Sequence, residues 1–384
     1  MRNLTSKLPN TATSIFTHMS QLALQHQAIN LSQGFPDFDP SPRLISLVEQ
    51  YLRTGPNQYA PMAGVRALRE QISDKVATTV DVCYHPDTEI TITAGATQAL
   101  FTAMATLIRP GDEVILFEPA YDAYGPTVQV FGGIPKPVIL RAPDFAIDWS
   151  VVAALITPQT RLIVINSPNN PTARVLSDTD YQQLIQLIRN TDCYVLSDEV
   201  YEHIVYDGVQ RRSAAHYPSL RERAFVVASF GKLYHTTGWK VGYCLAPHEL
   251  TAEFRKVHQF NVFSVNTPIQ HALADFMKDA EAYLELGAFF QKKRDFLETA
   301  LQETGFRPLP CQGTYFLVAD YSAISRLPEK EFCETLTKQH GIATIPIAAF
   351  YHRDINQHLV RICFAKQEQT LQQAVERLLQ VSPF

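Results

Sequence analysis

The sequence lacks the features of a membrane or secreted protein. Among its 384 residues, apolar runs such as 224–228 are far too short to span a bilayer. Near the N-terminus, polar residues stand where a signal peptide would carry its apolar region: Thr5, Ser6, Lys7, Asn10 and Thr11. We therefore expect a cytoplasmic location and no membrane partner.

Disulfide and metal-binding patterns are also missing, as is a surplus of positive charge. The six cysteines form no CxxC pair and the twelve histidines form no HExxH motif. We predict buried, reduced thiols and no metal site. The formal net charge of -5 at pH 7 argues against a nucleic-acid partner.

The middle of the chain alternates short apolar strands with amphipathic helices. The pattern predicts strands at 88–93, 113–117, 161–165, 194–197 and 225–229, and helices at 96–108, 121–131 and 178–188. Such alternation indicates an α/β fold with a mainly parallel sheet, and sheets of this kind bind ligands at the carboxyl ends of their strands. Four candidate residues lie where the predicted strands end: Gly95, Asn166, Asp198 and Ser229.

The pattern changes after about residue 250. Helical periodicity dominates 252–301, and the rest of the chain predicts strands at 315–319 and 359–364 and helices at 329–340 and 367–379. We interpret these data as a large domain over 41–285 and a smaller α/β domain over 286–384. The segment 1–40 is expected to pack on the small domain through an N-terminal helix, whose apolar face comprises Ile15, Phe16, Met19, Leu22 and Ala23.

One short loop carries two amines and two hydroxyl groups. Ser-Phe-Gly-Lys ends at Lys232, and Thr-Gly-Trp-Lys ends at Lys240. Lys232 can form a Schiff base with an aldehyde, while Ser229 and Lys240 can hold a phosphate. Pyridoxal phosphate has both groups, and its pyridine nitrogen takes an acid, for which Asp198 is the candidate. A P-loop is excluded because Val226 replaces its first glycine, and the SxxK motif lacks its companions SDN and KTG.

Three further motifs support a site for a phosphorylated cofactor and a carboxylate. Ala96 and Thr97 follow Gly95 at the start of a helix, where free N–H groups bind anions. Asn170 lies in the proline-pinned loop NSPNNPT and can donate to a phenolic oxygen. Arg361 interrupts the apolar string VRICF, so a buried guanidinium needs an anion there, either a substrate carboxylate or a structural salt bridge.

Taken in order, AGAT, NSPNNPT, SDEVY, SFGK with TGWK, and VRICF resemble the class I and II aminotransferases. The resemblance runs nearly end to end and implies the pyridoxal-phosphate-dependent fold type I of aspartate aminotransferase. The strings QGFPDF, NQYAP, SDEVYEHI and GTYFL resemble the kynurenine and glutamine transaminase group, and within it the bacterial methionine aminotransferases. Three positions depart from the usual family pattern: Ala173, Leu233 and Lys240.

The resemblance implies a role for each candidate residue. Lys232 is expected to bind the cofactor's aldehyde and to move the α-proton, and Asp198 to pair with the pyridine nitrogen. Asn170 and Tyr201 are expected to bind the phenolic oxygen. The other implied contacts are Tyr121 on the ring, Ala96, Thr97, Ser229 and Lys240 on the phosphate, and Arg361, with Gly34 and Asn170, on the substrate carboxylate. Tyr59 would reach the phosphate of a neighbouring subunit, which implies a homodimer.

The implied reaction is a ping-pong transamination between an L-amino acid and a 2-oxo acid. Aromatic residues near the family's site suggest an apolar pocket and a methionine, aromatic, kynurenine or glutamine donor: Phe16, Tyr59, Tyr121 and Phe350. Core packing is the alternative explanation for Phe16 and Phe350. A cysteine-conjugate β-lyase on the same fold is the alternative activity. A ligand-sensing regulator is disfavoured, because only a short lead without a basic extension precedes QGFPDF.

Overall fold

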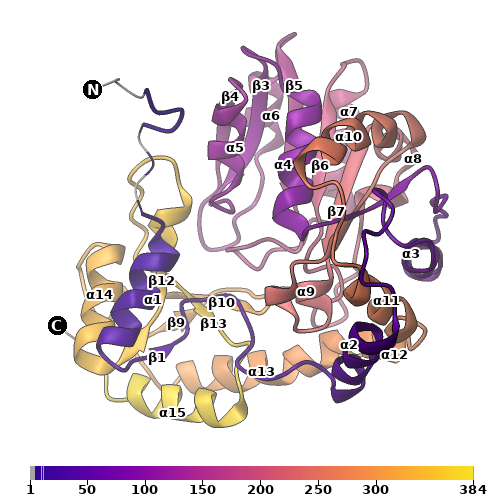
Figure 1. Ribbon diagram of the computed structural model, residues 1–384. Helices are drawn as coiled ribbons and strands as arrows, with labels where there is room; N and C mark the ends of the chain where they lie inside the picture. The colour runs from indigo at the N-terminus through magenta and orange to yellow at the C-terminus, as the bar shows by residue number, and fades with distance from the viewer. Residues whose placement is uncertain (1–4, 10, 12, 384) are drawn as a thin grey trace.

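The structure is a computed structural model that describes residues 5–9, 11 and 13–383. Figure 1 shows two layered regions, a larger one with most of the sheet strands and a smaller one that contains helices α1 (Ile15–Gln25), α14 (Glu329–His340) and α15 (Glu368–Leu378). Helix α13 (Leu286–Leu301) runs below both regions in this view. Within the described part of the chain, no helix combines the length and apolar character needed to cross a membrane. The cytoplasmic location stays a prediction.

The larger region is built on a seven-stranded sheet of order β2-β8-β7-β6-β5-β3-β4. Its strands are β2 (Ile90–Thr93), β3 (Glu113–Glu118), β4 (Ile134–Ile139), β5 (Thr160–Asn166), β6 (Tyr194–Asp198), β7 (Ala224–Ser229) and β8 (Gly242–Leu245). The pairs from β4 to β7 are parallel, whereas β8 is antiparallel to both of its neighbours. The predicted mainly parallel sheet is therefore confirmed, and β8 is a strand that the sequence pattern did not indicate.

Strands β5, β6 and β7 are buried on both faces. In β5, residues 162–165 are at most 2% exposed. A strand covered on both faces carries apolar side chains in succession rather than in alternation, which explains the uninterrupted apolar run in the sequence. The three strands end at Asn166, Asp198 and Ser229, as predicted. These polar residues follow the apolar runs directly and lie at the same edge of the sheet.

Helices cover this sheet or lie at its ends. They are α2 (Pro42–Thr54), α3 (Arg66–Val80), α4 (Ala96–Leu107), α5 (Tyr124–Val130), α6 (Trp149–Leu155), α7 (Asp178–Ile188), η1 (Ala214–His216), α8 (Pro218–Arg221), α9 (Phe230–Leu233), η2 (Thr237–Trp239), α10 (His248–Asn261), α11 (Thr267–Phe276) and α12 (Glu281–Leu284). Helix α7 has its predicted bounds, because Ser177 and Asp180 form a capping box at its start.

Two helix predictions were wrong in their bounds. The helix expected from residue 121 starts at Tyr124, because the chain before it leaves the sheet in a turn whose Ala120 N–H donates to Phe350 O at 3.0 Å. The helical stretch expected over 252–301 is divided into separate helices. One break follows α10, where the Asn266 side chain accepts the Ile269 N–H at 3.1 Å and so begins α11.

The smaller region has an antiparallel sheet of order β12-β13-β10-β9. Its elements are β9 (Arg307–Pro308), β10 (Phe316–Asp320), β12 (Ile345–Pro346), β13 (Leu359–Cys363), η3 (Ile347–Phe350), α14 (Glu329–His340) and α15 (Glu368–Leu378). Helix α14 has its predicted bounds. In β13 the register places Arg361 opposite Val318 of β10.

The N-terminal segment lies against the smaller region. Strand β1 (Ile29–Asn30) pairs in parallel with β11 (Ile342–Ala343), and α1 (Ile15–Gln25) lies beside α14 (Figure 1). Helix α1 buries Met19, Leu22 and Ala23 of its predicted apolar face. The domain boundaries at residues 40 and 285 stay predictions. Residues 1–4, 10, 12 and 384, which include the outer ends of the predicted domains, lie outside the described residues.

All six cysteines are free thiols, and five of them are buried. Cys83 is the exception, because it lies exposed in the loop that follows α3. The prediction that the thiols are buried is therefore wrong at this one position. Among the residues that the structure describes, no three His, Cys, Asp or Glu side chains gather as metal ligands would.

Candidate active site

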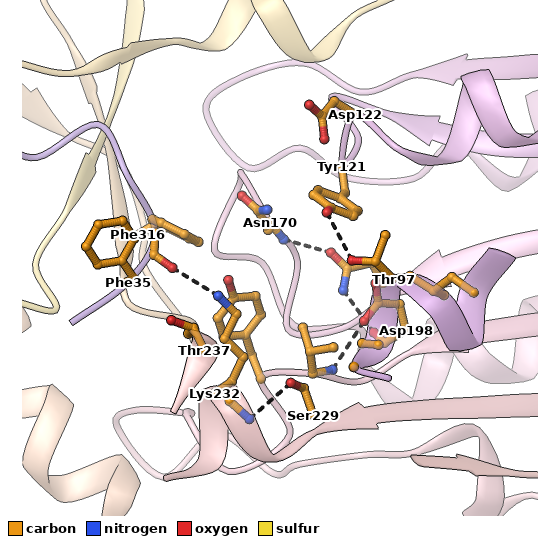
Figure 2. Close-up of a pocket in the computed structure, with 18 of the residues that line it drawn as sticks. Phe35, Thr97, Tyr121, Asp122, Asn170, Asp198, Ser229, Lys232, Thr237 and Phe316 are labelled. Atoms are coloured by element: carbon orange, nitrogen blue, oxygen red, sulfur yellow. Dashed lines mark hydrogen bonds between the residues drawn. The ribbon is translucent and has the colours of Figure 1, made fainter. Parts of the chain in front are cut away.

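A cavity of about 360 Å³ opens at the carboxyl ends of β5, β6 and β7. This volume falls in the usual range for small-molecule sites, roughly 300–1,000 Å³. Eleven of the twelve candidate residues line it: Gly34, Ala96, Thr97, Tyr121, Asn170, Asp198, Tyr201, Ser229, Lys232, Lys240 and Arg361. In Figure 2, Phe35 and Phe316 lie opposite Thr97 and Asp198, with Asn170 and Lys232 between the two sides. The structure thus gathers residues from both regions around one space.

Lys232 reaches the cavity from the short helix α9, directly after β7. The Ser229 hydroxyl accepts the Gly231 N–H at 3.2 Å and caps this helix. The Lys232 Nζ donates to Gly34 O at 2.9 Å and to the Tyr315 hydroxyl at 2.7 Å. Burial lowers the pKa of Lys232 to about 8. The amine can therefore lose its proton within the physiological pH range.

Asp198 is the acid of the cavity and is held by a tyrosine that the sequence analysis missed. Its carboxylate accepts the Tyr124 hydroxyl at 2.6 Å and the Val200 N–H at 3.3 Å. Burial raises the pKa of Asp198 to about 6, against the opposing effect of these hydrogen bonds. The group is mostly ionised at neutral pH. The second tyrosine of the string Tyr-Asp-Ala-Tyr, at the start of α5, was the available signal.

The N-terminus of α4 forms an anion-binding corner. Gly95 caps this helix with φ at +78°, and no side chain occupies the first free N–H groups. A Cβ on Gly95 would lie 3.4 Å from the end of the Lys240 side chain. Ser229 and Lys240 line the same cavity. A glycine turn, free amides, a hydroxyl and an ammonium together suit a phosphate.

Arg361 is a buried cation without an ionic partner. Its guanidinium donates to Asn170 Oδ1 and to Ser32 O, both at 2.7 Å, and it lies 3.8 Å from the ring centre of Phe316. In the part of the chain that the structure describes, the Nε atom has no hydrogen-bond partner. Burial lowers the pKa of Arg361 to about 10, so it stays charged at neutral pH. Among the described residues no carboxylate lies within ion-pair distance of it, so the structural salt bridge considered above is not found.

Tyr59 is the one candidate that the structure does not bring into the cavity. Its side chain is 82% exposed and packs edge-to-face on Phe263 at 5.4 Å between ring centres. Of the other aromatic candidates, Phe16 and Tyr121 line the cavity, whereas Phe350 is buried behind it against Phe16. Core packing is thus the better description of Phe350.

Two departures from the family pattern have local explanations. Ala173 has φ at +61°, a left-handed conformation that favours glycine and costs about 1–2 kcal/mol for other residues. Its carbonyl accepts the N–H groups of Gln312 and Gly313 at 3.0 Å, which offsets part of that cost. Leu233 is 4% exposed and packs in the core below the lysine loop. Neither residue lines the cavity.

The fold has a solved counterpart in a variant of aspartate aminotransferase from Thermus thermophilus. The two share 30% identity with a TM-score of 0.90, over 99% of this chain and all of that one. The protein therefore has the aspartate aminotransferase-like fold type I of pyridoxal-phosphate-dependent enzymes. The cavity fits this cofactor, since it offers an amine for the aldehyde, an acid for the pyridine nitrogen and a corner for the phosphate.

The sequence profile of the family "Aminotransferase class I and II" matches residues 26–378. The chain belongs to this family and is a pyridoxal-phosphate-dependent transaminase. It is 52% identical to methionine aminotransferase from Escherichia coli, over 98% of both chains. A crystal structure of an E. coli protein with a methionine aminotransferase function matches with 51% identity and a TM-score of 0.97, over 99% of this chain and all of that one. Kynurenine–oxoglutarate transaminase from Dictyostelium discoideum is 33% identical, over 96% of this chain and 94% of that relative.

Proposed function

We propose that this transaminase takes its amino group from a neutral L-amino acid of the methionine type. Aromatic amino acids, kynurenine and glutamine are the further candidate donors, and a 2-oxo acid is the acceptor. The observation that carries the proposal is the buried Arg361, which has no ionic partner among the described residues and lines the same cavity as Lys232. The 52% identity to a methionine aminotransferase supports the choice of donor.

The proposed cofactor contacts follow the chemistry of the cavity. Lys232 takes the aldehyde, and Asp198 holds a proton on the pyridine nitrogen. Asn170 and Tyr201 bind the phenolic oxygen, while Tyr121 lies on the ring. The phosphate is held at the helix corner by Ala96, Thr97, Ser229 and Lys240. When bound, pyridoxal phosphate supplies a carbonyl that takes up the amino group and a ring that accepts electron density from the α-carbon.

Arg361 is proposed to bind the α-carboxylate of the substrate. Because its Nη atoms are fixed by Asn170 and Ser32, the guanidinium is already oriented before the substrate arrives. A carboxylate there would supply the negative charge that the buried guanidinium lacks. Gly34 and Asn170 are the proposed additional contacts.

Lys232 is proposed to carry the proton between the α-carbon and the carbonyl carbon of the bound cofactor. It can accept this proton only as a neutral amine. Burial and the nearby positive charges of Arg361 and Lys240 keep its pKa near 8, so a useful fraction is neutral at physiological pH. The activity is therefore expected to rise with pH up to about 8.

The charges that line the cavity favour a neutral substrate side chain. Lys232, Lys240 and Asp198 have cofactor contacts in this proposal, which leaves Arg361 for the α-carboxylate. The remaining charged residue among the described lining is Asp122, which is exposed and therefore lies at the cavity opening. A second carboxylate would meet this negative charge, while Phe16, Phe35 and Phe316 offer apolar surface.

A homodimer is proposed to complete the phosphate corner with Tyr59. In the single chain, Tyr59 and Phe260 are 82% and 88% exposed, which is unusual for large aromatic side chains. Phe263, which is 45% exposed, packs on Tyr59, so these two exposed aromatic side chains form one surface. Sedimentation analysis, with Phe260→Asp as a variant that weakens association, would test the assembly. A fully active monomer would contradict it.

The first experiment records the visible spectrum of the purified protein with methionine and then with a 2-oxo acid. We expect the band of the lysine-bound cofactor to disappear with methionine and to return with the oxo acid. A band that methionine leaves unchanged would contradict the proposed donor. Neither the geometry nor the relatives described above favour the β-lyase alternative, which predicts pyruvate and a thiol from a cysteine conjugate.

The preference for a neutral donor is tested with Asp122→Asn. Removing the negative charge should raise kcat/KM for aspartate relative to methionine by up to about tenfold, or roughly 1.4 kcal/mol. Binding of maleate and of 3-phenylpropionate, followed by the cofactor spectrum, measures the same preference without turnover. Faster turnover of aspartate than of methionine by the unaltered enzyme would contradict the proposal.

A further inference from the structure

Tyr315 completes a closed triangle of hydrogen bonds around the amine of Lys232. The Tyr315 hydroxyl lies 2.7 Å from Lys232 Nζ and 2.6 Å from Gly34 O. Lys232 Nζ is itself 2.9 Å from Gly34 O. The tyrosine belongs to the string GTYFL, for which the proposed function assigns no role.

The direction of each hydrogen bond follows from the number of available protons. A tyrosine hydroxyl has one proton, and a carbonyl oxygen can only accept. Because Tyr315 donates its proton to Gly34 O, its oxygen faces Lys232 as an acceptor. A neutral amine has two N–H groups and one lone pair, and both N–H groups are then engaged by Tyr315 and Gly34. The lone pair of the amine remains free.

We propose that Tyr315 is a positioning residue that holds the free Lys232 amine with its lone pair open to the cavity. The amine is free whenever it is not bonded to the cofactor, which is when the substrate's α-proton must be transferred. This inference rests on the transaminase function proposed above. It assigns to Tyr315 the orientation of the proton acceptor, while Lys232 remains the catalytic residue.

Both acceptors of the triangle are fixed in place. The Tyr315 side chain has no exposed surface, and its ring packs edge-to-face on Tyr201 at 5.1 Å between ring centres. Gly34 has no room for a side chain, because a Cβ there would lie 2.6 Å from the Phe316 ring. The amine therefore meets two acceptors that cannot follow it if it moves, and proton transfer is sensitive to errors of about 1 Å.

The groups that face Lys232 have opposing effects on its pKa, and together with burial they lower it and so favour the neutral amine. Arg361 from β13 and Lys240 after η2 both oppose a positive charge on it, and burial acts in the same direction. Asp198 and the Cys363 thiol act in the opposite direction. The rings of Tyr201 and Tyr315 lie 5.7 and 5.3 Å from Nζ and would also stabilise an ammonium. These opposing influences leave the pKa near 8.

The test compares the unaltered enzyme with Tyr315→Phe, which removes the hydroxyl and keeps the ring. We expect kcat for methionine to fall by roughly 10- to 100-fold with little change in KM, because substrate binding does not involve this oxygen. The isotope effect with α-deuterated methionine should increase, because the step that is slowed transfers the α-proton. An unchanged kcat and isotope effect would overturn the proposal.

Tyr321→Phe is the matched control. Tyr321 likewise has no exposed surface and donates its hydroxyl to a backbone carbonyl, Leu327 O, at 2.7 Å, but only Tyr315 of the two also accepts a hydrogen bond from Lys232. It should lose thermal stability to a similar extent while it keeps kcat and the isotope effect. An equal loss of kcat in both variants would assign Tyr315 a purely structural role and overturn the proposal.

A crystal structure of the enzyme with pyridoxamine phosphate gives a readout that does not depend on turnover. In this form Lys232 is not bonded to the cofactor. We expect its Nζ within hydrogen-bonding distance of Tyr315 Oη and Gly34 O, and displaced or spread over several rotamers in Tyr315→Phe. An amine that lies away from both oxygens in the unaltered enzyme would overturn the proposal. If instead the unaltered enzyme turns over no amino donor, the proposed function fails while this structure still tests the triangle.

Discussion

Two buried lysines of this molecule form the same triangle of hydrogen bonds with different acceptors. Lys232 donates to Tyr315 and Gly34 O at the cavity. Behind the loop that follows β6, Lys75 of α3 donates to the Tyr243 hydroxyl at 2.7 Å and to the Glu202 carboxylate, and Tyr243 donates to Glu202 at 2.9 Å. In each triangle the tyrosine donates to the acceptor that it shares with the lysine.

The difference between the triangles is the charge of the shared acceptor. Arg211 also contacts Glu202, at 2.8 Å, and the two cations hold the pKa of this carboxyl well below its usual range in spite of burial. The Lys75 triangle is therefore part of a buried ion-pair network in which the Glu202 carboxylate is shared by two cations, as suits a structural role. Around Lys232 the shared acceptor is a neutral carbonyl, so the lysine can release its proton. In this pair of triangles, the lysine whose shared acceptor carries no charge is the one that lines the cavity.

The largest effect is expected from a variant of Lys232, the lysine of the triangle at the cavity. Lys232→Ala should reduce transamination of methionine by at least roughly 10,000-fold, because both the group for the aldehyde and the proton carrier are lost. The cofactor should still bind without the covalent link, as dialysis and absorbance would measure. Near-normal turnover would contradict the assignment of this lysine.

Arg361→Leu removes the second uncompensated cation. We expect kcat/KM for methionine to fall roughly 100- to 10,000-fold, because two charge-assisted hydrogen bonds to the substrate are lost at about 1.5–3 kcal/mol each. The thermal midpoint should stay the same or rise, since a buried charge without an ion pair is removed. A sharp loss of stability would instead indicate that Arg361 is structural.

Lys75→Met should show the opposite pattern. It leaves Glu202 buried with Arg211 as its remaining cation, so the free energy of unfolding should fall by roughly 3 kcal/mol. Urea titration followed by tryptophan fluorescence measures this loss. The value of kcat per folded enzyme should change little, and a large drop would weaken the distinction between the two triangles.

The smallest effects are expected from variants of Tyr243 and Tyr315, the tyrosines of the two triangles. Tyr243→Phe should lower the free energy of unfolding by roughly 1–3 kcal/mol, because two hydrogen bonds of the buried network are lost. It should leave the isotope effect with α-deuterated methionine unchanged, unlike Tyr315→Phe. Equal isotope effects in the two variants would remove the contrast between a structural and a positioning tyrosine.

The sequence predicted those residues of the site that stand out in a local pattern, at the end of an apolar run or within one. Asn166, Asp198 and Ser229 were identified because each ends an apolar strand, and the order of strands in a parallel sheet then brings them together. Arg361 was identified because a charge within an apolar run is unusual. The roles assigned to these residues remain proposals.

The parts that were missed depend on contacts between distant segments. Tyr315 is 83 residues from Lys232 and 281 residues from Gly34, so no local pattern links the three. Tyr124 was placed inside a helix, although it begins one and turns its hydroxyl to Asp198. Strand β8 was missed because four residues after a turn give too short a pattern.

The N-terminal segment supplies main-chain oxygens to two of the three cations that line the cavity, Ser32 O to Arg361 and Gly34 O to Lys232. A main-chain carbonyl is present whatever the side chain at its own position, so a point mutation cannot delete either acceptor, although a side chain at Gly34 would clash with the Phe316 ring and displace its carbonyl. Insertion or deletion of one residue between β1 and Gly34 would shift the register and displace both acceptors. These two contacts thus depend on the length of this segment as well as on its side chains, and variants with one residue inserted or deleted there would alter both contacts together.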